Sequence, residues 1–102
     1  MPGAIHLTYT TAILLQTIRN GGHYGFEIMD VTGLPSGTVY PALRRLESAR
    51  LIESRWEDER KAAAGQRPQR RYYRMTRSGE QMLLEALRRY PLLARAAVEK
   101  KP

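Results

Sequence analysis

The most informative stretch of the sequence for the fold is LPSGTVYPALRRLESARLI, from Leu34 to Ile52. Val39, Leu43 and Leu46 recur in it at the spacing of one helical face, which predicts a helix that buries this face in a core. We expect Ser36 to be the N-cap of this helix. The residues expected to point outward are Gly37, Tyr40, Pro41, Arg44 and Ser48.

Pro41 is an unusual residue for the interior of this helix. It cannot donate a hydrogen bond to the carbonyl of Gly37, and its ring crowds that carbonyl. Because residue 37 is glycine and lies near the helix start, we expect a cost below the ~3 kcal/mol of a mid-helix proline. An outward Tyr40 beside such a proline does little for stability, and it indicates a surface that meets a partner.

Length and composition predict one small globular domain. The chain has 102 residues, of which 42% are hydrophobic, and no apolar run approaches the ~18 residues of a membrane span. It has no cysteine, which excludes disulfides and thiolate metal sites and fits a reducing compartment. Residues 1–20 carry no signal-peptide pattern. We expect a cytoplasmic protein that does not associate with a membrane.

Positive charge is concentrated in one short segment. Residues 1–59 carry five basic and seven acidic groups, whereas residues 60–77 carry seven basic groups and no acid. Residues 78–102 carry five basic and three acidic groups, so the middle segment equals the net charge of +7 of the whole chain. Such a segment is typical of a contact with a polyanion. The alternative is a solvated basic loop that has no partner.

Two further helices are expected before the stretch quoted above. The first lies within LTYTTAILLQTIRNGG, residues 7–22, and the two glycines end it. The second lies within HYGFEIMDVTG, residues 23–33, and Gly33 ends it. The candidates for the N-cap of the first helix are Thr8, Thr10 and Thr11. The candidates for the buried residue of the second helix are Phe26, Ile28 and Met29.

The remainder of the chain predicts a hairpin followed by a helix. LIESRWEDE and QRRYYRMT, starting at Leu51 and Gln69, alternate as strands do, with a polar basic loop between them. Aromatic residues on a hairpin are most often core or cross-strand contacts, and this is the expectation for Trp56, Tyr72 and Tyr73. Thr76 or Ser78 caps the final helix. Pro91 kinks or breaks it.

Four motifs in this order resemble the PadR family of bacterial transcriptional regulators. They are YGFEI, SGTVYPALRRLE, LIESRWE and RYYRMT, within a match from about Ala12 to Leu84. The resemblance implies a mainly α fold with a small β-hairpin, namely a winged helix-turn-helix domain over residues 1–76 and a helical dimerisation segment over residues 77–102. Ala49-Arg50 departs from the family, which usually carries glycine in that turn.

The resemblance implies a sequence-specific regulator of transcription that binds double-stranded DNA. The third helix of such a domain enters the major groove, and a basic wing lies on the backbone or in the minor groove. Repression is implied by the family alone. The residues expected to contact DNA are Tyr24, Ser36, Gly37, Thr38, Tyr40, Arg44, Lys61, Arg67, Arg70 and Arg71.

Two of these assignments have alternatives. Tyr24 is assigned to a phosphate contact by the resemblance, and partial burial is the other reading of the same residue. Arg70 and Arg71 alternate on a strand, so only one of them faces the duplex. Outside the assigned set, Arg74 and Arg77 are expected to pair with Glu53 or Glu57 across the sheet rather than to touch DNA.

The family also implies a homodimer on a near-palindromic operator, with half-sites about one helical turn, ~34 Å, apart. The interface residues would be Leu83, Leu87, Tyr90, Leu93 and Ala94. The alternative for these residues is packing on the first helix of the same chain. Both contacts are expected, on different faces.

No catalytic, metal or cofactor site is expected. His6 and His23 are the only histidines, and neither has a defined acidic partner or a third metal ligand. Two other function classes stay open: a winged helix that binds RNA, and a module that binds proteins. Some relatives respond to phenolic acids or flat hydrophobic drugs, so a small hydrophobic or phenolic effector is a further candidate partner that no residue here identifies.

Overall fold

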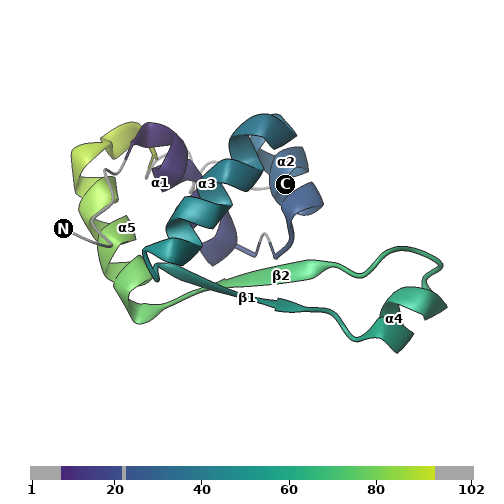
Figure 1. The fold of residues 1–102 in the computed structure, drawn as a ribbon. Helices are drawn as coiled ribbons and strands as arrows, with labels where there is room; N and C mark the ends of the chain where they lie inside the picture. The colour runs from purple at the N-terminus through teal and green to yellow at the C-terminus, as the bar shows by residue number, and fades with distance from the viewer. Residues whose placement is uncertain (1–7, 22, 94–102) are drawn as a thin grey trace.

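A computed structural model describes residues 8–21 and 23–93 of the chain. Three helices and α5 form one body, and the β1–β2 hairpin extends from it as an arm with α4 at its tip (Figure 1). The fold is the expected winged helix: mainly α, with one two-stranded antiparallel hairpin. The elements are α1 (Tyr9–Arg19), α2 (Gly25–Thr32), α3 (Ser36–Ser48), β1 (Ile52–Trp56), α4 (Glu59–Ala64), β2 (Arg71–Met75) and α5 (Arg77–Arg89).

Thr8 caps α1, as one of the sequence candidates. Its hydroxyl accepts from the backbone N–H of Thr11 at 3.2 Å, and the Thr11 hydroxyl accepts from the backbone N–H of Thr8 at 2.9 Å. This reciprocal pair satisfies two donors that the first turn would leave unpaired. The helix ends at Arg19, just before Gly21, whose φ is 109°. Gly22, the second expected terminator, lies outside the described residues.

The second helix is short and buries only part of its predicted set. Ile28 is fully buried and Met29 partly, whereas Phe26 is 71% exposed, so it is not the core residue of α2. Residues 26 and 28 lie about 200° apart around a helix, so one of them faces solvent when the other faces the core. Gly33 ends the helix as predicted, with a left-handed φ of 75°.

The third helix buries the predicted stripe. Val39, Leu43 and Leu46 are at most 1% exposed. The predicted N-cap was wrong: Pro35 is the cap, and Ser36 is the first helical residue. The reason is that the Pro35 carbonyl already accepts the first helical bonds, from Thr38 and Val39 at 2.9 and 3.0 Å.

The turn after α3 places a non-glycine residue in the left-handed region. Arg50 has φ 62°, its N–H donates to the Glu47 carbonyl at 2.9 Å, and the N–H of Leu51 donates to the Leu46 carbonyl at 3.0 Å. These two bonds are those of a Schellman motif, in which Arg50 occupies the position that glycine favours. The sequence analysis had noted that Ala49-Arg50 stands where the PadR family usually carries glycine.

Arg50→Gly should therefore raise the free energy of unfolding by about 1 kcal/mol, because glycine adopts this φ without the side-chain clash. The Arg50 side chain is exposed, so its removal should cost little. Urea denaturation of both proteins measures the change. Arg50→Ala is the control, since it removes the same side chain and keeps the strain. Equal stability of the glycine and alanine variants would contradict the explanation.

The hairpin connects to the helical body along one edge of β2. The register pairs Glu53 with Arg74 and Ser54 with Tyr73. On the edge of β2 that faces away from β1, the backbone N–H of Tyr73 donates to the His23 carbonyl at 2.7 Å, and Tyr24 forms an isolated β-bridge with Tyr72. The residues that start α2 therefore behave as a short third strand, which fixes α2 against the wing.

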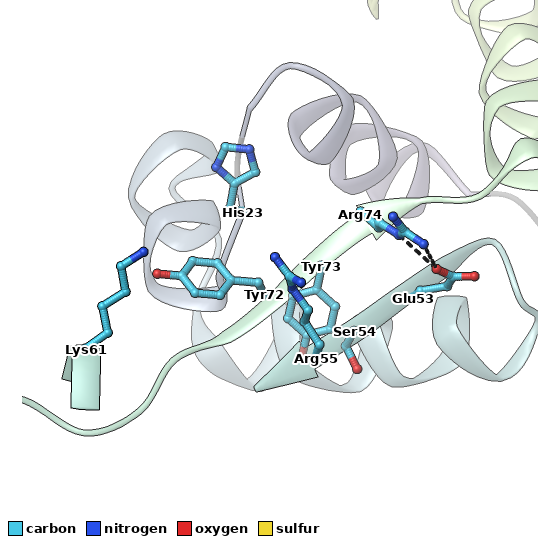
Figure 2. Close-up of a pocket in the computed structure, with 8 residues that line it drawn as sticks. All are labelled: His23, Glu53, Ser54, Arg55, Lys61, Tyr72, Tyr73 and Arg74. Atoms are coloured by element: carbon cyan, nitrogen blue, oxygen red, sulfur yellow. Dashed lines mark hydrogen bonds and ion pairs between the residues drawn. The ribbon is translucent and has the colours of Figure 1, made fainter. Parts of the chain in front are cut away.

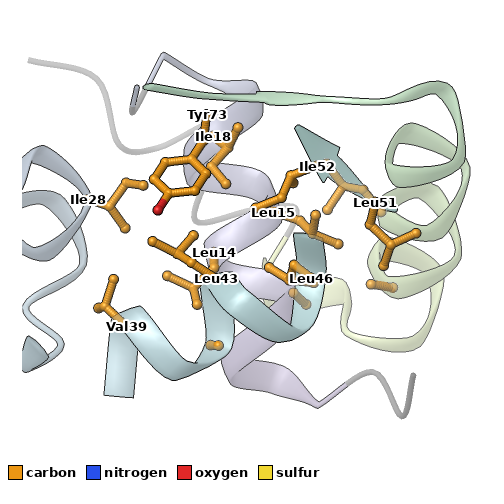
Figure 3. Packing of buried hydrophobic residues seen from close by; sticks show 14 of the residues in the cluster. Leu14, Leu15, Ile18, Ile28, Val39, Leu43, Leu46, Leu51, Ile52 and Tyr73 are labelled. Atoms are coloured by element: carbon orange, nitrogen blue, oxygen red, sulfur yellow. The ribbon is translucent and has the colours of Figure 1, made fainter. Parts of the chain in front are cut away.

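One hydrophobic core joins the helices to the base of the hairpin. It is centred on the side chains drawn in Figure 3, with Tyr73 entering from β2. The final helix begins at the predicted cap Thr76, whose hydroxyl accepts from the N–H of Gly79 at 3.0 Å. It ends at Arg89, before Pro91, as the sequence predicted. Its residues Leu83 and Ala86 are fully buried in the core.

The expected loop between the strands contains a helix that the sequence analysis missed. Asp58 caps α4 by accepting from the backbone N–H of Arg60 at 2.7 Å, and Gly65 follows its last residue. Three alanines, the strongest helix formers, occupy residues 62–64. An aspartate, an alanine run and a glycine were the signal that could have revealed this helix.

Candidate nucleic-acid interface

The outer face of α3 carries the side chains expected to meet DNA. Ser36, Gly37, Tyr40 and Arg44 are exposed, and Thr38 is half-buried. Arg44 forms no ion pair or hydrogen bond within the described residues. An unpaired guanidinium on an exposed helix face keeps all of its donors for a partner.

The glycine at the start of α2 allows Tyr40 to pack against that helix. A Cβ built on Gly25 would lie 2.6 Å from Cε1 of the Tyr40 ring. No side chain other than hydrogen fits there without moving the tyrosine. The position of Tyr40 thus depends on the absence of a side chain at Gly25.

A groove of about 830 Å³ separates the helices from the wing. Phe26 and Trp56 line it and are 71% and 60% exposed. The sequence analysis placed Trp56 in a core or in a cross-strand contact; it is not in the core, and Arg71 of the facing strand lies over its ring at 5.4 Å. Other residues that line the groove are Tyr24, Gly25, Tyr40, Arg44, Arg70 and Arg71.

Tyr24 is half-buried at the inner end of this region. Arg70 lies over its ring at 4.1 Å, and the ring of Tyr72 meets it edge-on at 5.7 Å. Tyr24 is therefore partly buried, which was one of the two expectations for this residue. A DNA contact by Tyr24 stays a prediction, and Arg70 lies beside it.

The basic residues of residues 60–77 divide into paired and unpaired groups. Arg67 binds Glu57, Arg71 approaches Glu47 at 3.5 Å, and Arg74 binds Glu53 at 2.8 Å. The Arg74–Glu53 pair was predicted. The side chains that form no ion pair within the described part of the chain are those of Arg60, Lys61, Arg70 and Arg77.

Glu57 forms the most buried of these ion pairs. Its side chain is 2% exposed, and its two carboxylate oxygens accept from Arg67 at 2.6 and 2.7 Å. These bonds, with a backbone bond from Arg70, lower the pKa of Glu57 from 4.5 to about 2, against the opposing effect of desolvation. The same bonds raise the pKa of Arg67. Arg67 thus has a structural role, and its predicted DNA contact is untested.

The lowered pKa of Glu57 predicts how the free energy of unfolding changes with pH. A carboxylate whose pKa is lower in the folded state contributes stability above pH 4.5, and the contribution is lost as the pH falls towards 2. The free-energy gap between the wild type and Glu57→Gln should therefore be larger at pH 6 than at pH 2.5. Urea denaturation at both pH values measures it. A gap of equal size at the two values would show that the pair does not depend on ionised Glu57.

The opposite face of the hairpin has a second hollow, of about 560 Å³. In Figure 2, Lys61, Arg55 and His23 are arranged around Tyr72, and the Arg74–Glu53 pair lies to one side. The sequence analysis did not single out Arg55. No cluster of three or more histidine, cysteine or acidic side chains suited to a metal occurs in residues 8–21 and 23–93, and His6 lies outside them.

The predicted interface residues of the C-terminal segment have different environments. Leu83 and Leu93 are at most 3% exposed, within the core of their own chain, whereas Leu87 and Tyr90 are partly buried. Tyr90 packs edge-on against Tyr9 of α1, with ring centroids 5.3 Å apart. Intrachain packing, the expected alternative, therefore accounts for much of this set. Ala94 lies outside the described residues.

Residues 14–85 match the model of the transcriptional regulator PadR-like family, which is most of the chain. The chain belongs to the PadR-like family. This membership makes it a DNA-binding transcriptional regulator. No curated protein matches its sequence.

Solved structures agree with this family. A PadR family transcription regulator from Clostridium difficile is 26% identical, with a TM-score of 0.72 over 87% of this chain and 94% of that one. A transcriptional regulator from Clostridium thermocellum is 27% identical, with a TM-score of 0.66 over 86% and 88% of the two chains. Within the described residues of this PadR-like chain, no helix is long and apolar enough to cross a membrane.

Proposed function

We propose that this PadR-like chain is a homodimeric, sequence-specific repressor that binds a near-palindromic operator in double-stranded DNA. The observation that carries the proposal is the exposed start of α3, whose unpaired Arg44 faces a groove bordered by the basic wing. A helix with such a surface fits the major groove, and its N-terminal residues meet base edges.

We propose different roles for α3 and for the wing, which line opposite sides of the groove. Arg44 and Tyr40 on α3 are placed to contact bases and phosphate. On the wing, Arg70 lines this groove and Lys61 lines the hollow on the opposite face of the hairpin. Neither side chain has a carboxylate partner within the described residues, and we propose that both contact the backbone or the minor groove. Arg67 and Arg71 are held by Glu57 and Glu47, so they add less to the attraction for DNA.

Operator binding can be tested with two variants of α3. Arg44→Ala should weaken specific binding about tenfold, because an arginine contact to a base or phosphate is worth ~1–3 kcal/mol. Tyr40→Phe should weaken it by about threefold through the loss of one hydroxyl hydrogen bond. Fluorescence anisotropy with duplex from the region upstream of the protein's own gene, compared with unrelated duplex across a salt series, measures both.

The matched control is Arg88→Ala, which removes a positive charge from α5, where Arg88 pairs with Glu85. Its affinity should stay within twofold of the wild type at physiological salt, since exposed pairs contribute little. Wild-type affinity for both variants would remove α3 from the interface. Tighter binding to structured RNA than to any duplex would replace the proposed function with RNA binding.

The dimer would use the apolar side chains that the chain does not bury. Leu84 and Leu92 are 50% and 69% exposed, next to the partly buried Leu87 and Tyr90. A two-fold arrangement of this surface places two recognition helices on half-sites about one turn, ~34 Å, apart. Residues 77–102 are accordingly proposed as the dimerisation segment and residues 1–76 as the DNA-binding domain.

Leu84→Glu should shift the protein towards monomer by burying a charge at the interface, and operator binding should weaken with it. Analytical ultracentrifugation across a concentration series measures the assembly. Arg89→Gln changes the charge by the same amount at an exposed position on the other side of α5 and should leave the dimer intact. A wild-type protein that binds operator as a monomer would contradict the proposed dimer.

A further inference from the structure

Glu57 joins the two ends of residues 58–69, and we call this junction of Glu57 with Gln69 and Arg70 the neck of the wing. Besides the two bonds to Arg67, Glu57 donates its backbone N–H to the Arg70 carbonyl at 2.8 Å and accepts the Gln69 side-chain amide on its own carbonyl at 2.6 Å. Every polar group of Glu57 is thus used to join the two ends of residues 58–69. The segment that contains α4 therefore starts directly after Glu57, and its far end is bonded back to Glu57.

Glu57 also connects the wing to the helices that face the groove. One carboxylate oxygen accepts from the backbone N–H of Arg70 at 3.2 Å, and the other lies 3.4 Å from the Tyr72 hydroxyl. Arg70 and Tyr72 are the two residues that contact the Tyr24 ring. Two routes therefore run from the Glu57 carboxylate to Tyr24, immediately before α2.

We propose that Glu57 is a positioning residue for operator binding, which holds the basic wing at a fixed place relative to the recognition helix. This inference rests on the proposed function and deepens it. The Glu57 side chain is only 2% exposed, so its carboxylate acts through Arg67 and Arg70 rather than by direct contact with DNA. Without the carboxylate, the half-buried Arg67 loses its partner, and only the backbone bonds of Glu57 with Arg70 and Gln69 still hold residues 58–69 to the body.

Charge alone makes the opposite prediction, which gives the proposal a sharp test. Replacing a glutamate by glutamine near DNA removes a repulsive charge and should tighten binding at every sequence. If Glu57 positions the wing, Glu57→Gln should instead weaken binding to the specific operator. Binding to unrelated duplex needs no fixed wing, so it should be unchanged or tighter.

Glu53→Gln is the matched control. Glu53 lies in β1, four residues before Glu57, and also pairs with an arginine, but its side chain is 55% exposed. Both variants change the net charge by the same amount. We expect Glu57→Gln to weaken operator binding about tenfold and Glu53→Gln to leave it equal or slightly tighter, because a partner lost from a buried pair costs far more than one lost from an exposed pair.

Trp56, the only tryptophan of the chain, precedes Glu57 and gives a readout independent of DNA. Its fluorescence anisotropy should fall in Glu57→Gln and not in Glu53→Gln, because the neck becomes mobile. Circular dichroism should show both variants folded, since the main core lies away from the neck. A buried group that served only global stability would change the unfolding midpoint and leave the ratio of specific to unrelated affinity as it was.

The outcomes separate the inference from the proposed function. If the wild type prefers operator and Glu57→Gln binds it as tightly as Glu53→Gln does, the positioning role is wrong and the proposed function stands. If the wild type shows no preference for any duplex, the proposed function fails and the positioning role fails with it. Loss of operator preference in Glu57→Gln alone, with lower Trp56 anisotropy, supports the inference.

Discussion

The burial of one stripe of α3 is the constraint on which the rest of the structure depends. Val39, Leu43 and Leu46 are buried in the shared core, and the period of the helix then forces Tyr40 and Arg44 outward. The same constraint explains why Pro41 is tolerated. The carbonyl that it leaves unpaired belongs to Gly37, which is exposed, so water can satisfy it. An exposed α3 face and a proline therefore coexist without a buried unpaired carbonyl.

The contact between the start of α2 and β2 converts the hairpin from an appendage into part of the domain. A two-stranded hairpin is marginally stable alone. Here the Tyr73 side chain enters the core while its backbone N–H binds the His23 carbonyl, so the base of the wing is held on a face and along an edge. Residues 58–69 lie beyond this base, so the interactions of Glu57, which directly follows β1, matter for where the wing tip lies.

Sequence periodicity predicted the elements well, and its failures have physical causes. The α3 stripe, the Gly33 and Pro91 boundaries and the paired strands each depend on local rules. Ser36 was taken as the cap because serine suits that position, but the backbone of Pro35 already accepted the first bonds. Phe26 was a core candidate by hydrophobicity, and the geometry of a two-turn helix with Ile28 buried left it in solvent. Local sequence rules cannot select between such candidate caps or core residues, because tertiary packing determines which one is used.

The candidate interface was predictable only at the level of segments. The α3 face and the basic wing followed from the motifs and the charge, whereas the partner of each arginine depends on the register of the hairpin and on contacts between residues ten or more positions apart. Glu57 and Arg67 are ten residues apart, and Arg71 approaches Glu47 across an intervening strand. The missed α4 also shortened the path between the paired residues, since a helix rises only ~1.5 Å per residue.

The distribution of charge acquires a structural meaning once these pairs are known. The acidic excess of residues 1–59 includes Glu47, Glu53 and Glu57, and each of them holds one arginine of the basic segment. The wing is thus less positive towards DNA than its sequence indicates. Indiscriminate attraction grows with the number of free cations, whereas discrimination depends on contacts made in a fixed geometry. If the proposed function holds, the glutamates that pair with the wing lower the indiscriminate attraction and supply the fixed geometry, which would favour specificity over affinity.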